Sequence, residues 1–236
     1  MRRKIQYRSL LPVYLLLLAG FLLLAVGGSR AVTVLTVNAP VTDRKTVVID
    51  AGHGGMDGGA TSCTGVLESK FNLEIALKLN DLMHLLGINT VMIREADCSV
   101  HTQGETIAQK KVSDLKERVR IVNSTEDCML VSIHQNHFPD ARYSGAQVFY
   151  APTEGSKDLA SVLQVNLVKT VNPNSNRQIK KADGIYLMQH IDCPGILVEC
   201  GFLSNPQEEY LLRNTAYQQK LSSIIACTVS TWLFGT

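Results

Sequence analysis

The sequence lacks the features that define several common protein classes. It carries no strong net charge, because 23 basic residues nearly balance 21 acidic ones, so a strongly basic nucleic-acid-binding protein is not expected. Glycine (17) and proline (7) are ordinary in number, and no internal repeat or heptad array occurs, which excludes collagen-like and coiled-coil proteins. Because 45% of the 236 residues are hydrophobic, the chain can form a packed core, and intrinsic disorder is excluded as its main state.

The cysteines also lack the pattern of a disulfide framework. They are scattered, no CxxC pair occurs, and the chain is long enough to fold around its own core. We therefore expect them to be free and to behave as small hydrophobic residues. The six are Cys63, Cys98, Cys128, Cys193, Cys200 and Cys227.

The beginning of the chain differs in composition from the rest. Residues 1–30 contain five basic side chains and no acidic one, which leaves 18 basic against 21 acidic side chains in the remainder. Behind the basic head, the apolar run over residues 10–28 is 19 residues long. This is longer than the apolar region of a cleaved signal peptide, about 7–15 residues, and close to the roughly 20 residues that span a bilayer.

These features predict an exported protein. We expect residues 1–29 to form a signal anchor, with a cleaved signal peptide as the alternative, and residues 30–44 to form a tether. The basic flank places the N-terminus in the cytoplasm. The folded domain, residues 45–236, would then lie on the extracytoplasmic side of the membrane, either anchored or secreted.

The apolar periodicity predicts strands and helices in alternation. Short apolar runs predict strands over residues 46–49, 89–93, 129–133, 146–150, 185–188 and 196–199. Amphipathic spacing predicts helices over residues 68–86, 113–123, 156–170, 206–213 and 217–233, the second with Ser113 as its N-cap. The polar segment 95–112 predicts a long loop. This order is typical of an α/β fold with a mostly parallel central sheet flanked by helices.

Residues that suit metal chemistry follow the predicted strands, where α/β sheets place their sites. His53 lies in a glycine-rich loop after the first strand, His134 ends the third, and Glu68 opens the first helix. Two histidines and a carboxylate are typical of a catalytic zinc site with one open position. Simpler roles remain open, because Glu68 could cap its helix and each histidine could be a loop residue. His137 is an alternative to His134.

Further polar residues are candidates for supporting roles. Glu199 ends an apolar strand, so we expect it to be paired or functional. Asp50 is a candidate hydrogen-bond partner for a ligand histidine. Arg94 ends the second strand and could hold a substrate carboxylate or join a surface ion pair.

Several separated motifs resemble the zinc-dependent N-acetylmuramoyl-L-alanine amidases, the amidase-3 family. They are VIDAGHGG at 48–55, Glu68 followed by Asn72, SIHxN at 132–136 and VExGFLSN at 198–205. The resemblance extends over residues 46–233. It implies Zn²⁺ at His53, Glu68 and His134, Glu199 as the catalytic carboxylate, and hydrolysis of the amide bond between N-acetylmuramic acid and L-alanine of peptidoglycan.

The resemblance also carries finer expectations. Asn136, inside the third motif, is a candidate substrate-binding residue together with Arg94. Gln135 stands where many relatives have a small residue, so the pocket shape could differ, and Cys200 follows the catalytic glutamate. Segments 111–119 and 145–150 resemble the sporulation amidases of the family. That likeness implies a role in spore cortex maturation, through muramic-δ-lactam formation, and in germination.

Members of the family are commonly autoinhibited or activated by a partner. An activator or regulatory protein is therefore a candidate partner, with residues 95–112 and 172–184 as its contacts. Two other functions compete with the amidase. One is a zinc exopeptidase that acts on stem peptides, and the other is a membrane-tethered peptidoglycan-binding module without activity.

Overall fold

The computed structural model describes residues 45–235. The predicted signal segment and tether lie outside these residues. Within the described part, none of the helices is long and apolar enough to cross a membrane.

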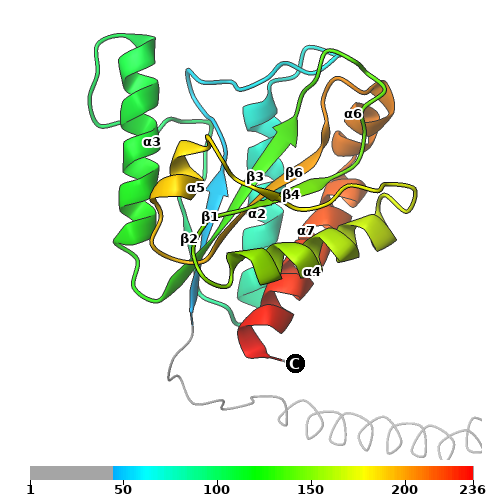
Figure 1. Cartoon of the computed structure of the whole chain (residues 1–236). Coiled ribbons are helices and arrows are strands. Elements are labelled where there is room, and N and C mark those ends of the chain that lie inside the picture. The colour runs from blue at the N-terminus through cyan, green and yellow to red at the C-terminus, as the bar shows by residue number, and fades with distance from the viewer. Residues whose placement is uncertain (1–44, 236) are drawn as a thin grey trace, which may run out of the picture. The chain divides into compact units, whose positions relative to one another are not determined.

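A six-stranded sheet forms the centre of the domain, in the order β2-β1-β3-β6-β4-β5 (Figure 1). Neighbouring strands are parallel except that β4 runs antiparallel to β6. The mostly parallel α/β fold predicted from the sequence is therefore confirmed. The strands are β1 (Thr46–Ala51), β2 (Thr90–Met92), β3 (Cys128–Asn136), β4 (Gln147–Tyr150), β5 (Lys180–Lys181) and β6 (Gly195–Phe202).

Helices cover both faces of the sheet (Figure 1). One face packs against α2, α4 and α7, and the other packs against α3 and α5. The central strands are buried on both sides, so their sequences are continuous apolar runs rather than alternating ones. The helices are α2 (Glu68–Leu85), α3 (Ile107–Asn123), α4 (Ser156–Thr170), α5 (Tyr186–His190), α6 (Pro206–Leu212) and α7 (Thr215–Phe234).

Helix α3 begins six residues earlier than the sequence prediction. Thr106 is its N-cap and forms a capping box with Gln109, in which each side chain accepts a hydrogen bond from the other's backbone N–H. This cap satisfies donors at the helix start, so residues 107–112 are helical rather than part of a loop. Ser113 lies inside the helix, where its hydroxyl accepts hydrogen bonds from the backbone of Thr102 and Gln103.

The strand predicted at 185–188 is wrong. Residues 186–190 form the short helix α5, which buries Leu187 and Met188 against the sheet. The sheet edge is taken instead by β5, which pairs with β4. A run of four apolar residues is too short to show whether its periodicity is that of a strand or of a buried helical turn. In this chain, the packing of Leu187 and Met188 determines that the segment is helical.

Candidate active site

Four acidic or histidine side chains meet where the parallel strands end. His53 follows β1, His134 belongs to β3, and Glu199 belongs to β6. In the ladders, β3 lies between β1 and β6, and His134 is the register partner of Glu199. Glu68 is the first residue of α2 and lies across the glycine-rich loop from His53. The strand order therefore brings together residues that are far apart in sequence.

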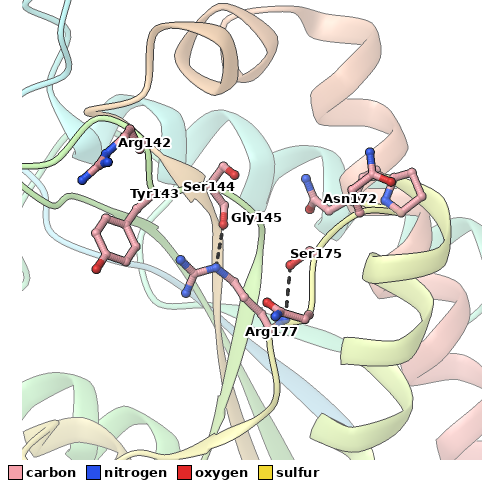
Figure 2. A pocket seen from close by; sticks show the side chains of 11 residues that line it. Arg142, Tyr143, Ser144, Gly145, Asn172, Ser175 and Arg177 are labelled. Carbon is pink, nitrogen blue, oxygen red and sulfur yellow. Dashed lines mark hydrogen bonds between the residues drawn. The ribbon is translucent and has the colours of Figure 1, made fainter.

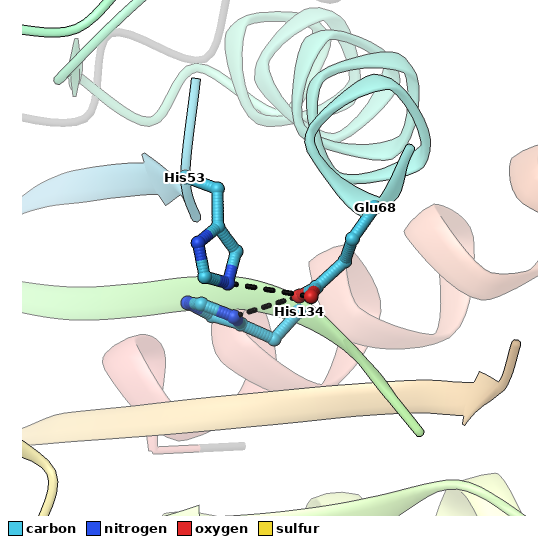
Figure 3. Close-up of side chains that lie close together, drawn as sticks. All are labelled: His53, Glu68 and His134. Atoms are coloured by element: carbon cyan, nitrogen blue, oxygen red, sulfur yellow. Dashed lines mark hydrogen bonds and ion pairs between the residues drawn. The ribbon is translucent and has the colours of Figure 1, made fainter. Parts of the chain in front are cut away.

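His53, Glu68 and His134 converge on one point (Figure 3). His53 Nε2 lies 3.3 Å from Glu68 Oε2, and His134 Nδ1 lies 3.0 Å from Glu68 Oε1. One ligand-type atom from each residue lies within 4.8 Å of the others, which is close enough to hold a metal ion. His137 is exposed and is not a member of this cluster.

The Glu68 carboxylate is fixed by hydrogen bonds from its surroundings. Asn72 Nδ2 donates to Oε1 at 3.1 Å, and the backbone N–H groups of Ala60 and Gln135 donate at 3.0 and 3.2 Å. Burial alone would raise the pKa of Glu68, but its hydrogen bonds and charge interactions with His134 and His53 hold that pKa well below its usual range. The Glu68 carboxylate is thus ionised at neutral pH.

His53 is oriented by a residue that sequence reasoning missed. Its Nδ1 atom lies 2.9 Å from Asp57 Oδ2, and Asp57 Oδ1 lies 2.7 Å from Lys111 Nζ. Burial would lower the pKa of His53, but Glu68 and Asp57 raise it to about 9. A carboxylate that holds the second nitrogen of an imidazole is typical of metal-ligating histidines. The sequence feature that could have predicted this partner is the position of Asp57, four residues after His53 in the same loop.

Two glycines let the loop lie directly against the cluster. A Cβ atom on Gly52 would be 2.2 Å from the His134 ring, and one on Gly59 would be 2.6 Å from Glu68 Oε2. Both distances are far below van der Waals contact. Gly59 also has a φ of +68°, which disfavours a side chain there.

Glu199 is a half-buried residue beside the three residues of the cluster. Its Oε2 atom is buried and has no hydrogen-bond partner in the described part of the chain. Burial raises the pKa of Glu199 to about 7, although the charges of His134 and His53 act in the opposite direction. An unsatisfied buried carboxyl oxygen is costly, and such groups are typical of functional sites.

Asp50 does not contact a ligand imidazole, contrary to the sequence prediction. Its carboxylate is hydrogen-bonded by Arg118 and by the Ser132 hydroxyl, the latter at 2.6 Å. Arg118 also donates to the backbone carbonyl of His53 at 2.7 Å. Burial would raise the pKa of Asp50, but Arg118 is the main group that lowers it. Asp50 therefore anchors the loop that carries His53 through Arg118.

Arg94 does not fit the predicted role of binding a substrate carboxylate. It is buried, and its guanidinium donates to the backbone carbonyls of Ala51, Gly52, Ser69 and Ala96 at 2.8–3.0 Å. All three guanidinium nitrogens are engaged, so Arg94 stabilises the start of the glycine-rich loop instead.

The remaining predicted residues, Asn136 and Gln135, end β3. Asn136 is half-buried beside the site, and its substrate-binding role stays a prediction. Gln135 is buried, and its Nε2 atom donates to Asn72 Oδ1 at 3.3 Å. Its side chain is therefore buried against Asn72 rather than lining an open pocket.

An α/β sheet with two histidines and a glutamate converging at its edge, beside a further carboxyl group, is typical of metal-dependent hydrolases. Comparisons with known proteins identify the family. Residues 47–230 match the family model of N-acetylmuramoyl-L-alanine amidases. The chain belongs to this family and is an enzyme of that class, as the sequence motifs predicted.

Individual relatives agree with this assignment. The germination-specific N-acetylmuramoyl-L-alanine amidase of Bacillus subtilis is 38% identical over 183 residues, which cover 77% of this chain and 76% of that protein. The CwlD amidase from Clostridioides difficile, solved in complex with the GerS lipoprotein, is 38% identical with a TM-score of 0.78, covering 82% of this chain and all of that one. An N-acetylmuramoyl-L-alanine amidase from Clostridium difficile 630 has a TM-score of 0.71 at 32% identity, covering 83% of this chain and all of that one.

Proposed function

We propose that this amidase is zinc-dependent and that it acts on peptidoglycan of the spore cortex. The observation that carries the zinc proposal is the convergence of His53, Glu68 and His134 within 4.8 Å, next to the Glu199 carboxyl group, whose buried Oε2 atom has no hydrogen-bond partner among the described residues. Two imidazole nitrogens and one carboxylate oxygen are a preferred ligand set of catalytic zinc, and they leave a position open for water or substrate.

The surroundings of the three residues fit such an ion. Glu68 is held by hydrogen bonds from two backbone N–H groups and Asn72, and His53 is held by Asp57. These partners fix the ligand atoms in place, as is usual around catalytic metals. Gly52 and Gly59 allow the loop to close over the ligands without displacing them.

The reaction is a hydrolysis in which Glu199 acts as general base and then as general acid. His53, Glu68 and His134 would hold the zinc ion, which when bound would supply a water of lowered pKa and a Lewis acid for the carbonyl group. Glu199 accepts the proton of the attacking water as general base and returns it to the nitrogen of the departing L-alanine. Because the Glu199 Oε2 atom makes no competing hydrogen bond within residues 45–235, it is free to perform both transfers. The products are a glycan strand with free muramic acid and a stem peptide.

The spore role is supported by the relatives. The amidase from Bacillus subtilis is described as germination-specific, and its similarity to this chain is 38% over three quarters of either protein. A cortex amidase removes stem peptides from muramic acid, which prepares the sugar for muramic-δ-lactam formation. Its substrate lies outside the cytoplasmic membrane, in agreement with the basic and apolar N-terminal segment of this chain.

A lipoprotein is the partner class that the comparisons favour. The CwlD amidase of Clostridioides difficile was solved as a complex with the lipoprotein GerS. We expect this chain to bind an extracytoplasmic lipoprotein as an activator or regulator, and the segment at 95–112 is a candidate contact. Co-purification of the full chain with membrane lipoproteins from the same cells tests this expectation.

Metal analysis combined with mass spectrometry of digested peptidoglycan tests the proposed function. Purified protein should hold about one zinc ion and release intact stem peptides that begin with L-alanine. Trimming of free stem peptides without cleavage at muramic acid would favour a zinc exopeptidase, and absence of both zinc and turnover would favour a binding module. For the spore role, a deletion strain should lose muramic-δ-lactam from its cortex, and an unchanged lactam content would reject that role.

A further inference from the structure

A polar cavity of about 570 Å³ is formed by residues 142–145 and 171–177 (Figure 2). Two arginines and no acidic residue line it, and the other lining groups are mainly amides, hydroxyls and backbone. Arg142, one of the two arginines, pairs with Asp140 on the surface. Arg177 has no ion-pair partner within residues 45–235. The cavity therefore offers a guanidinium group outside any ion pair in that range, while the Glu208 carboxylate behind the lining lies near enough to interact with its charge.

Arg177 is held in a fixed position. Its Nε atom donates to the Ser144 carbonyl at 2.6 Å, and one terminal nitrogen, Nη1, donates to Gln147 Oε1 at 2.9 Å. The guanidinium carbon lies 4.5 Å from the centre of the Phe202 ring. In the described part of the chain, the other terminal nitrogen, Nη2, has no hydrogen-bond partner. The Glu208 carboxylate nearby accepts instead from the backbone N–H groups of Phe202 and Gly145.

Gln147 connects Arg177 to the catalytic centre. His134 in β3, Glu199 in β6 and Gln147 in β4 are successive register partners, so their side chains project from the same face of the sheet. Leu197 and Phe149, two residues from Glu199 and Gln147, belong to the apolar cluster under α3 and α5, which identifies that face. His134, Glu199 and Gln147 thus form one row across three neighbouring strands. This row links the proposed metal ligand and proton-transferring residue to the residue that holds Arg177.

From this row we infer that the cavity is a substrate subsite in which Arg177 binds a free carboxylate of the stem peptide. The inference rests on the proposed amidase reaction. Peptidoglycan stem peptides carry carboxylates beyond the L-alanine, and a fixed guanidinium with a free N–H edge is suited to bind them. Arg177 is then a specificity-determining residue that contacts the part of the substrate leaving with L-alanine.

The distances along the sheet agree with this role. Adjacent strands are about 4.8 Å apart, and the Gln147 side chain adds a few ångströms more. Arg177 is thus one strand spacing and one side-chain hydrogen bond away from Glu199, a separation that a few extended peptide residues of about 3.3–3.6 Å each can span. A stem peptide whose first amide bond lies at Glu199 can extend over Gln147 and place a later carboxylate at Arg177.

Cleavage of two matched substrates tests the subsite. One is a muramyl tripeptide with its free carboxylates, and the other is the same compound with those carboxylates converted to amides. Zinc-loaded wild-type protein should cleave the acidic substrate with the higher kcat/KM. In R177Q this preference should disappear, with a loss of about tenfold to hundredfold on the acidic substrate, mainly as a higher KM. R177K should lose less kcat/KM on the acidic substrate than R177Q does. Both variants should cleave the amidated substrate almost as well as wild type.

The controls distinguish a loss of substrate binding in R177Q from a loss of folded structure. R120Q removes an exposed arginine that pairs with Glu117 on α3 and should leave both substrates unaffected. Zinc content and thermal unfolding of R177Q should match wild type. An equal loss on both substrates, or no preference in wild type, rejects the subsite while leaving the amidase function intact. If wild type cleaves neither substrate, the proposed function is rejected and the subsite with it.

Discussion

His53 Nδ1 lies 2.9 Å from Asp57 Oδ2, so the imidazole that points its Nε2 at Glu68 is held from behind by a second carboxylate. Asp57 is itself paired with Lys111. The pair fixes both the tautomer and the direction of the ring. We expect Asp57→Ala to weaken zinc binding by about tenfold to hundredfold, the usual effect of losing such a partner.

Competition with a chelator of known affinity measures this loss. Asp183→Ala is the matched control, because Asp183 pairs with Lys181 on an exposed surface away from the metal ligands in sequence. Equal zinc affinity for Asp57→Ala and wild type would show that His53 needs no such support.

Glu199→Gln keeps the size of the side chain and removes its ability to take a proton. Because Glu199 is not one of the three converging ligands, the variant should hold as much zinc as wild type. Turnover should fall by several orders of magnitude, since both proton transfers depend on this carboxyl group. Zinc content and the rate of muramyl peptide cleavage are measured on the same preparation. Near-normal turnover would show that Glu199 is not the proton-transferring residue.

Much of the site was predictable because each residue marks the end of a recognisable strand or the start of a helix. His53, His134 and Glu199 follow buried apolar runs, and parallel strands bring such positions to one edge of the sheet. The roles of Asp50 and Arg94 were not predictable. Both lie at strand ends, but their partners, Arg118 and four backbone carbonyls, depend on how the glycine-rich loop folds.

The two errors in the fold have different origins. The capping box of Thr106 and Gln109 is a local signal that was available in the sequence, and it outweighs the polar appearance of residues 95–112. The helix at Tyr186–His190 had no local signal, because a short apolar run fits either state. Its state is decided by the tertiary contacts of Leu187 and Met188.

The buried pair of Asp50 and Arg118 should contribute to stability in a pH-dependent way. Within residues 45–235, Asp50→Asn leaves Arg118 with Asp114 as its one carboxylate partner, and removing one member of a buried pair costs about 3–5 kcal/mol. Arg118 lowers the folded-state pKa of Asp50 below the ordinary value of 3.8. The contribution is therefore fully present above about pH 4 and is lost as the pH falls through the lowered pKa.

Urea unfolding of metal-free wild type and Asp50→Asn at a series of pH values tests this. The difference in the free energy of unfolding should be constant near neutrality and shrink below about pH 4. A difference that does not depend on pH would mean that the pair does not stabilise the fold through the charge of Asp50.

Gly52→Ala should damage the metal site while leaving the sheet intact. The added Cβ would lie 2.2 Å from the His134 ring, and it cannot move aside because Arg94 and Asn72 both donate to the Gly52 carbonyl. The imidazole must therefore shift away from Glu68, and zinc content and turnover should fall together. Gly65→Asn is the control, since a Cβ at Gly65 meets no atom within 4 Å and asparagine tolerates its left-handed backbone. Full zinc occupancy in Gly52→Ala would show that the position of the His134 ring is not needed for zinc binding.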